Sequence, residues 1–220
     1  MYMEFIGPEF ESHRVKKEKC LNELKDIIVR CNELLEGNCV YHHATLDEFP
    51  ELYSKQLNLF WCGKQTEQKM CEIGFNAGHS SMILLLGVKT PINFTIFDTQ
   101  HHGYTKPCFE YLQTAFDHVK FEFIVGDSTV TMPEWILQHQ ELKSTYDVIH
   151  VDGGHDEHCI SNDMKNSDFL LKTNGTLIVD DTDVDVINKY VESYIASGNY
   201  REIALLPTLG YRHRVLRKIR

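Results

Sequence analysis

After about residue 67, short apolar runs alternate with stretches of helical character, and this alternation constrains the fold more than any other feature. The apolar runs have the length of strands and lie at 70–75, 93–98, 120–125, 147–151 and 176–180. Predicted helices follow them, at 80–86, 107–116, 133–140, 159–171 and 184–196. Parallel strands need a crossover between them, so this alternation is typical of a parallel sheet covered by helices. The sequence therefore predicts an α/β fold.

Further helices are predicted ahead of this region. Apolar residues at three- and four-residue spacing predict a helix over 9–36. A second helical stretch covers 45–59 and is interrupted near Pro50. We therefore expect an N-terminal helical extension, residues 1–60, that forms a lid or an oligomer contact, followed by one α/β domain, residues 61–220.

The C-terminal end is predicted to form a hairpin. Residues 201–206 and 212–216 have strand character and flank a turn at Leu209 and Gly210. Arginine and lysine are concentrated in 212–220, the one basic cluster of the chain. We interpret that cluster as a strand with solvated charges and not as a binding surface.

Composition excludes several classes of function. The formal net charge of -10 argues against broad binding to nucleic acid or to an anionic membrane, since both require a positive field. No apolar stretch approaches the length that spans a bilayer, and the first residues lack the pattern of a signal peptide. The seven cysteines are an odd number without CxxC spacing, which predicts reduced thiols and a cytoplasmic protein.

A glycine loop follows the first predicted strand of the α/β region. It reads ExGxxxGxS from Glu72 to Ser80, whereas a dinucleotide-binding loop reads GxGxxG and holds a pyrophosphate. Gly74 and Gly78 allow a tight turn and close approach of a ligand, and Glu72 can pair with the cationic amino group of an amino-acid moiety. The loop thus suits a ligand without phosphate. Considered without the rest of the sequence, the same loop could also be a purely structural turn.

Acidic residues stand at the ends of the next two strands. Asp98 lies 26 residues after Glu72, where a carboxylate can accept hydrogen bonds from ribose hydroxyls. Asp127 and Ser128 follow the third strand and are placed to meet the edge of an adenine ring. Each aspartate alone could equally serve a turn. Together they predict a nucleoside site along the carboxyl edge of the sheet.

These elements resemble a class I S-adenosylmethionine-dependent methyltransferase over about residues 68–220. The resemblance implies a Rossmann-like seven-stranded sheet, mostly parallel with an antiparallel last strand, and helices on both faces. It places the methionine end of the cofactor at the glycine loop, the ribose at Asp98 and the adenine at Asp127 and Ser128. The residues it implies for binding S-adenosylmethionine are Glu72, Gly74, Asn76, Gly78, Ser80, Asp98, Asp127, Ser128 and Asp152.

A second acidic group follows the fourth and fifth strands. Asp152 begins the string DGGH, and Asp180 and Asp181 end the fifth strand. Converging carboxylates repel one another unless a cation lies among them, and oxygen ligands suit Mg²⁺, Ca²⁺ or Mn²⁺. The alternative is that Asp180 and Asp181 only cap a helix.

The acidic group resembles that of the metal-dependent small-molecule O-methyltransferases, of the catechol type and of the macrocin or antibiotic-sugar type. The resemblance implies a divalent ion, Mg²⁺ or Mn²⁺, held by Asp152, Asp180 and Asp181. It also implies that His155 is the catalytic base, with Asp152 as the second catalytic residue. A nearby cation is expected to lower the pKa of His155 and keep the imidazole neutral.

The sequence thus predicts methyl transfer from S-adenosylmethionine to a hydroxyl of a small molecule, a sugar being one candidate. A metal-independent reaction and a non-catalytic cofactor-binding subunit are the alternatives. No nucleic-acid or membrane partner is expected, and the N-terminal helices are a candidate contact for a homo-oligomer. His101, His102 and Tyr104 could line the cofactor site, whereas His150 is predicted to be a buried residue with its polar atoms satisfied.

Overall fold

The computed structural model describes residues 6–42, 46–208 and 212–220. Seven strands form one sheet in the order β3-β2-β1-β4-β5-β7-β6. Their bounds are β1 Lys69–Ile73, β2 Ile92–Asp98, β3 Val119–Val125, β4 Tyr146–Val151, β5 Leu171–Val179, β6 Tyr200–Glu202 and β7 Arg214–Lys218. The first five strands pair in parallel, and β7 runs antiparallel to both β5 and β6. The predicted Rossmann-like sheet with its antiparallel last strand is therefore confirmed.

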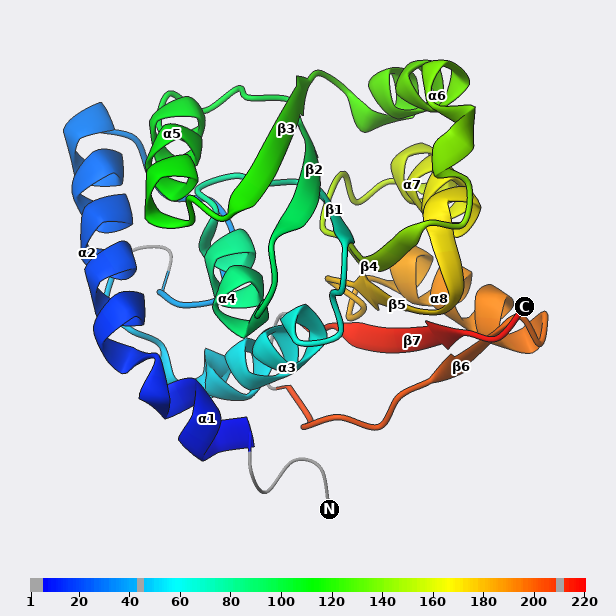
Figure 1. Ribbon diagram of the computed structural model, residues 1–220, viewed down its shortest axis with the longest axis horizontal. Helices are drawn as coiled ribbons and strands as arrows, with labels where there is room; N and C mark the ends of the chain where they lie inside the picture. Colours follow the sequence, from blue (N-terminus) through cyan, green and yellow to red (C-terminus); the bar gives the residue numbers. More distant parts are fainter. Residues whose placement is uncertain (1–5, 43–45, 209–211) are drawn as a thin grey trace.

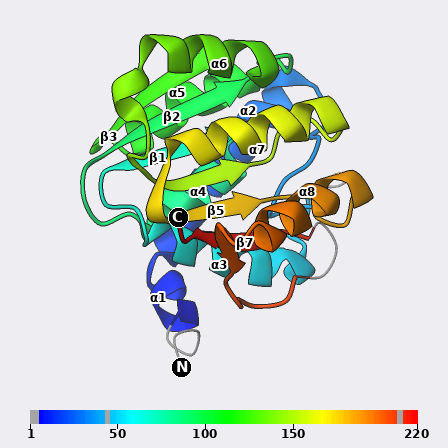
Figure 2. The same cartoon turned by 90° about the vertical axis from the view of Figure 1, so that its right-hand side faces the viewer.

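Helices cover both faces of the sheet (Figure 1). The α-helices are α1 Ile6–Ser12, α2 Arg14–Cys31, α3 Tyr53–Gly63, α4 His79–Gly87, α5 Thr105–Ala115, α6 Ser128–Gln138, α7 Glu157–Leu170 and α8 Asp185–Ala196, and the short 3₁₀ helices are η1 Pro50–Leu52 and η2 Gln140–Leu142. Figure 2 views the molecule from the side of α6, α7 and α8. The other face carries α4 and α5; α2 and α3 of the N-terminal region pack on them, and α1 packs on α2 and α3.

Alternation along each strand divides the core into two layers. Met70 and Phe94 point to the layer under α4 and α5, whereas Cys71 of the same strand as Met70 and Phe97 of the same strand as Phe94 point to the layer under α6 to α8. All four side chains are fully buried. Since both faces of a parallel sheet are covered, its strands are apolar on both sides, which is why they were recognisable as continuous apolar runs.

The N-terminal helices share the core of the α/β region. Phe10 and Leu24 belong to the same apolar cluster as residues of α4, and α3 packs along α4. The boundary predicted between residues 60 and 61 falls inside α3. Helices α1, α2 and α3 are therefore part of the helical layer on this face of the sheet.

Two glycines bring α3 and α4 into backbone contact. A Cβ on Gly63 would lie 2.0 Å from the carbonyl oxygen of Leu84, and a Cβ on Gly87 would lie 2.4 Å from the carbonyl oxygen of Phe60. No side chain fits in either gap. Glycine at both positions therefore fixes how close α3 can lie to α4.

Several predicted helix boundaries were wrong, because single residues begin or end the helices at other positions. The single helix predicted over 9–36 is two helices, because the chain turns at His13 and because Asn32, at a φ of 52°, ends α2 before Gly37. Helix α6 begins earlier than predicted, since Asp127 accepts a hydrogen bond from the N–H of Thr129 and caps it, which leaves Pro133 inside the helix.

Differences also occur in the predicted strands and around Pro50. Strand β5 begins directly after α7, and its register against β4 shifts between Tyr146 and Val148. In the predicted hairpin, β6 is only three residues long, and the turn at Leu209 and Gly210 lies outside the described residues. The stretch predicted over 45–59 is the 3₁₀ helix η1 followed by α3.

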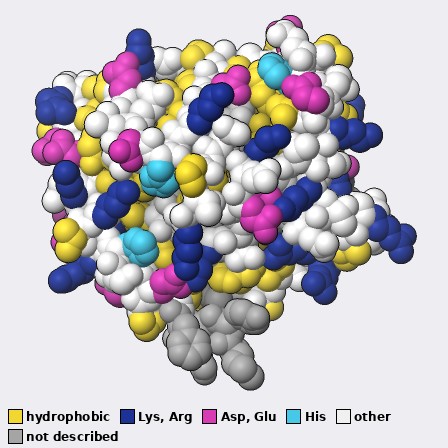
Figure 3. Space-filling model, viewed as in Figure 1, with side chains coloured by type: hydrophobic (Ala, Val, Ile, Leu, Met, Phe, Trp, Pro, Cys, Tyr) yellow, Lys and Arg dark blue, Asp and Glu magenta, His cyan; other side chains and the backbone are white. Residues whose placement is uncertain are grey.

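Among the described residues, no helix combines the length and the apolar character that crossing a bilayer requires. All seven cysteines are free thiols. Acidic and basic side chains are interspersed on the face shown in Figure 3. The cytoplasmic location and the oligomer contact stay predictions.

The buried carboxylate of Asp147 joins the starts of two strands and gives a test of the fold. It accepts hydrogen bonds from the backbone N–H groups of Gln68 and Lys69, at 2.6 and 2.8 Å, and pairs with Lys172. Burial alone would raise the pKa of Asp147, but these partners together hold it below its ordinary value. A lowered pKa means that the ionised side chain stabilises the fold above the pKa of the unfolded chain.

We expect Asp147→Asn to lower the free energy of unfolding by about 2–4 kcal/mol at pH 7, since a charged acceptor is lost from a buried site. The difference from wild type should shrink as the pH falls through the lowered pKa of Asp147, because wild type then loses the same charge. Urea unfolding at pH 7 and pH 3 measures both effects. Asp117→Asn, at a side chain that is 94% exposed, is the control. A difference that stays constant with pH would contradict the role of the charge.

Candidate active site

A cavity of about 590 Å³ opens at the carboxyl edge of the parallel strands. The loops that follow β1, β2, β3, β4 and β5 contribute to its wall. The N-terminal region contributes residues 36–39 and Lys55 of α3. Among the described lining residues, Lys55 is the one lysine or arginine. A ligand with several phosphates would therefore meet few cations here.

The glycine loop after β1 forms the floor of this cavity. Gly74 has a φ of 88°, and a Cβ on it would lie 1.9 Å from the carbonyl oxygen of Asp152. Only glycine fits at this position, because the loops that follow β1 and β4 lie so close together. Gly78 has a φ of 77°, but it packs against the ring of Phe75 and lies outside the cavity lining. Its function is to turn the chain into α4.

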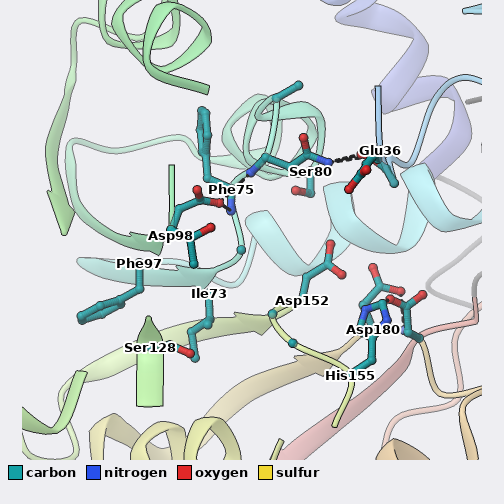
Figure 4. A pocket seen from close by; sticks show the side chains of 18 of the residues that line it. Glu36, Ile73, Phe75, Ser80, Phe97, Asp98, Ser128, Asp152, His155 and Asp180 are labelled. Carbon is teal, nitrogen blue, oxygen red and sulfur yellow. Dashed lines mark hydrogen bonds and ion pairs between the residues drawn. The ribbon is translucent and has the colours of Figure 1, made fainter. Parts of the chain in front are cut away.

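Asp98 holds the glycine loop in place. One carboxylate oxygen, Oδ2, accepts hydrogen bonds from the N–H groups of Phe75 and Asn76, at 2.7 and 2.9 Å. The other oxygen, Oδ1, accepts from the N–H of Gln100 at 2.6 Å. A carboxylate has about four acceptor positions, so Oδ1 can accept one further hydrogen bond from a ligand in the cavity. Figure 4 shows Asp98 beside Phe75, on the opposite side of the pocket from His155.

Glu72 lies beneath the cavity and not in its lining. Its side chain is fully buried, and it accepts hydrogen bonds from the hydroxyls of Ser80, at 2.6 Å, and of Ser81. A third contact joins it to Nδ1 of His150 at 2.8 Å. The predicted pairing of Glu72 with a ligand amino group would therefore pass through Ser80, which does line the cavity.

Asn76 ties the glycine loop to the N-terminal region. Its side-chain amide donates to the carbonyl oxygens of Glu36 and Gly37, and its Oδ1 accepts from the hydroxyl of Tyr104 at 2.7 Å. Asp127 and Ser128 line the cavity at the start of α6. The N-terminal segment and the loops after β1 and β2 thus form one wall.

The three carboxylates predicted to bind a metal lie on the far side of the cavity from Asp98. Asp152, His155 and Asp180 are gathered there, from the loops after β4 and β5 (Figure 4). Asp180 is buried, and its Oδ1 lies 2.7 Å from Nζ of Lys55, which is buried too. The same oxygen accepts the N–H of Asp181 at 2.9 Å.

The other oxygen of Asp180 faces a second cation. Its Oδ2 lies 3.5 Å from Nε2 of His150, whose Nδ1 contacts Glu72. Burial alone would lower the pKa of His150, but Asp180 and Glu72 raise it to about 10, so the imidazole is cationic at neutral pH. Two buried carboxylates are thereby balanced by two buried cations, His150 and Lys55.

The pKa values of Asp152 and Asp180 are shifted in opposite directions. Burial and the neighbouring charge of Asp180 raise the pKa of Asp152 well above its ordinary value. Burial also acts to raise the pKa of Asp180, but Lys55 and His150 outweigh it and lower that pKa. Asp180 therefore carries the charge that Lys55 neutralises, and Asp152 carries a proton more readily.

Asp181 contacts His155, the predicted base. Its Oδ2 lies 2.7 Å from Nε2 of His155, a side chain that is 55% exposed. Asp181, through this contact, raises the pKa of His155. The expectation that a bound divalent ion lowers this pKa stays a prediction, since the nearest charged group to the ring in this structure is the carboxylate of Asp181. Asp181 also orients the ring and leaves Nδ1 as the nitrogen that can accept a proton.

The fit of a divalent ion follows from these contacts. Among the described residues, side-chain ligand atoms converge within 4.8 Å as two separate groups, one with His150, Asp152 and Asp180 and one with Asp152, His155 and Asp181. The three predicted carboxylates do not converge as one such group, and both oxygens of Asp180 already face cations. The predicted ligand set therefore fits a divalent ion poorly.

Some lining residues were not predicted from the sequence. Lys55, Cys39 and His79 line the cavity, and all three side chains are buried. Nε2 of His79 has no hydrogen-bond partner, and burial lowers the pKa of this histidine to about 4. The signal for Lys55 was that it is the one charged residue of the helix that ends at Gly63. Of the three residues that could line the cofactor site, His101 and His102 line the cavity, whereas Tyr104 is buried outside its lining.

Comparison with known proteins identifies the family. A family model described as a methyltransferase domain matches residues 71–182, which carry the glycine loop and both acidic groups. The chain belongs to this methyltransferase family. Among curated proteins, none matches the sequence.

Solved methyltransferases share the fold at low sequence identity. An O-methyltransferase from Bacillus cereus, solved with SAH, is 15% identical, with 92% of this chain and 91% of that chain covered at a TM-score of 0.59. TomG, an O-methyltransferase from Streptomyces achromogenes, is 15% identical, with 91% and 89% covered at a TM-score of 0.63. A TDP-rhamnose 3'-O-methyltransferase of calicheamicin biosynthesis is 16% identical, with 88% and 93% covered at a TM-score of 0.62. The class I methyltransferase fold is confirmed.

Gly74 gives a test of the close approach that shapes the methyltransferase cavity. We expect Gly74→Ala to lower the free energy of unfolding by roughly 2–5 kcal/mol, from backbone strain and from the clash with Asp152. Gly198→Ala is the matched control, because Gly198 has a φ of 74° and nothing within 4 Å of its Cβ position. That variant should lose only roughly 1–2 kcal/mol. Equal losses in urea unfolding would show that the clash contributes nothing.

Proposed function

We propose that this methyltransferase transfers a methyl group from S-adenosylmethionine to a hydroxyl of a small molecule, a sugar being one candidate. The observation that carries the proposal is the free acceptor position on Asp98, in a cavity with one cationic lysine. A ribose hydroxyl can donate to Asp98, and a ligand without phosphate matches the lining. The three solved O-methyltransferases that share the fold support the same reaction.

The residues of the cavity fit S-adenosylmethionine. Gly74 lets the loops after β1 and β4 lie close together beside the cavity, and Asp127 and Ser128 offer polar atoms to an adenine edge. Ser80 stands above the fully buried Glu72, so a cationic amino group at the loop meets a negative field. When bound, the cofactor supplies an electrophilic methyl group on a sulfonium, which leaves a neutral thioether after displacement.

His155 is the base in this proposal. A hydroxyl attacks carbon poorly until its proton is removed, and a positioned imidazole typically contributes 10²–10⁴-fold to such a step. Nδ1 of His155 accepts the proton, and the carboxylate of Asp181 at Nε2 stabilises the cationic ring that results. Holding the hydroxyl beside His155 also replaces an encounter in solution by an oriented contact.

The metal-independent form of the reaction is the one we propose. Divalent assistance was predicted from Asp152, Asp180 and Asp181, and that prediction stays untested. The contacts of Asp180 with Lys55 and His150 leave this set little free capacity for an ion. The dyad of His155 and Asp181 at the cavity also favours an enzyme over a non-catalytic cofactor-binding subunit.

Asp98→Ala tests the cofactor site. We expect the affinity for S-adenosylhomocysteine to fall about 10–150-fold, which corresponds to the 1.5–3 kcal/mol of a hydrogen bond to a charged acceptor. Isothermal titration gives the affinity, and urea unfolding shows how far the loop itself is loosened. Asp117→Ala is the control at an exposed acid. Unchanged affinity in folded Asp98→Ala, or binding of NADH in place of S-adenosylhomocysteine, would overturn the assignment.

His155→Ala tests the base. Turnover should fall about 10²–10⁴-fold while the affinity for S-adenosylhomocysteine stays within about threefold of wild type. A panel of phenols and sugars, assayed by formation of S-adenosylhomocysteine, supplies the acceptor. His158→Ala, at an exposed histidine outside the cavity lining, is the matched control. Near-normal turnover in His155→Ala would remove this residue from the mechanism.

A further inference from the structure

Lys55 is a buried cation at the position where the family resemblance implies a metal ion. Its side chain is 5% exposed, lines the cavity, and lies 2.7 Å from Asp180. The ammonium therefore pairs with a buried carboxylate in the wall of the cavity. A lysine ammonium has three N–H donors, and one of them bonds to Asp180.

The helix that carries Lys55 is fixed on both sides. Gly63 and Gly87 set its backbone contact with α4. Asn58, one turn after Lys55, exchanges hydrogen bonds with the backbone of Leu206 at 2.8 and 3.1 Å. These contacts deliver the ammonium to the tips of the strands from a rigid element, as a positioned catalytic group requires.

We infer that Lys55 replaces the divalent cation in this methyltransferase and stabilises the acceptor oxygen during methyl transfer. The inference rests on the proposed function. The hydroxyl proton passes to Nδ1 of His155, the oxygen forms its bond to the methyl carbon, and the C–S bond breaks with its electron pair left on sulfur. Lys55 keeps its protons throughout and donates a hydrogen bond to the oxygen as charge develops on it. Asp180 holds the ammonium in place.

The structure distinguishes this role from simple charge neutralisation. His150 already faces Asp180 from inside the core, at 3.5 Å, so Asp180 would have a cationic neighbour without Lys55. The ammonium comes from the cavity side, where Asp152 and His155 also lie. It is therefore placed for a ligand oxygen and not only for Asp180.

Binding of Mn²⁺, followed by electron paramagnetic resonance with S-adenosylhomocysteine present, tests the inference. We expect wild type to bind no Mn²⁺ at millimolar concentration. Lys55→Gln removes the cation that pairs with Asp180, and this variant should bind Mn²⁺ at least tenfold more tightly than wild type. Lys55→Arg keeps the charge and should exclude the ion as wild type does. Lys89→Gln removes the same charge at a side chain that is 71% exposed and is the control.

Several outcomes would overturn the inference. One Mn²⁺ bound per wild-type chain would show that Lys55 does not hold the ion's position. No Mn²⁺ binding in folded Lys55→Gln would show that Lys55 is not what excludes it. With catechol as the probe acceptor, wild type should keep its activity in EDTA, and Lys55→Gln should lose about 10²–10³-fold at unchanged affinity for S-adenosylhomocysteine. Full activity in Lys55→Gln would contradict the catalytic role.

The same experiment separates this inference from the proposed function. If no form of the protein binds S-adenosylhomocysteine, the proposed function fails, whereas the Mn²⁺ measurements still report on Lys55 and the carboxylates. If S-adenosylhomocysteine binds normally and wild type needs Mn²⁺ for transfer to catechol, the inference fails and methyl transfer stands.

Discussion

A buried line of ionic contacts organises the active site, and most of what the cavity can do depends on it. It runs from Glu72 through His150 and Asp180 to Lys55, and so joins the ends of β1, β4 and β5 to an N-terminal helix. Removing one member would leave an unpaired charge in the core, which typically costs 3–5 kcal/mol. The line therefore couples the Asp180 side of the cavity to the glycine loop, since Glu72 also accepts a hydrogen bond from Ser80.

Asp98 performs two tasks with one carboxylate, and this explains how an open loop keeps a defined shape. Its bonds to the N–H groups of Phe75 and Asn76 fix the loop before any ligand arrives. In the proposed function, a ribose hydroxyl would meet an acceptor that is already oriented, so binding would order little of the protein. Asn76 extends the same framework to Glu36 and thereby makes the N-terminal segment part of the cofactor wall.

The sequence predicted the sheet well because buried parallel strands are apolar on both faces and end at polar residues. The sequence also predicted the acidic residues Asp98, Asp152 and Asp180, because each of them stands at the end of such an apolar run or directly after it. It failed where one local contact decides a boundary, as at Asn32, or where a partner comes from a distant helix. Lys55 and Asp180 are 125 residues apart, and nothing in the spacing of either motif reveals that they meet. The burial of Glu72 was hidden for the same reason, since its partners lie on two other elements.

The glycine pair between α3 and α4 has a consequence for how this enzyme tolerates change. Gly63 lies eight residues after Lys55, about 12 Å along the same helix axis. A methyl group at either glycine would push α3 outward and tilt it, and a tilt at one end of a rigid rod displaces the other end. The reach of the ammonium into the cavity is thus set by two residues that have no functional group. Variation at these positions would alter chemistry while leaving every polar residue of the site intact.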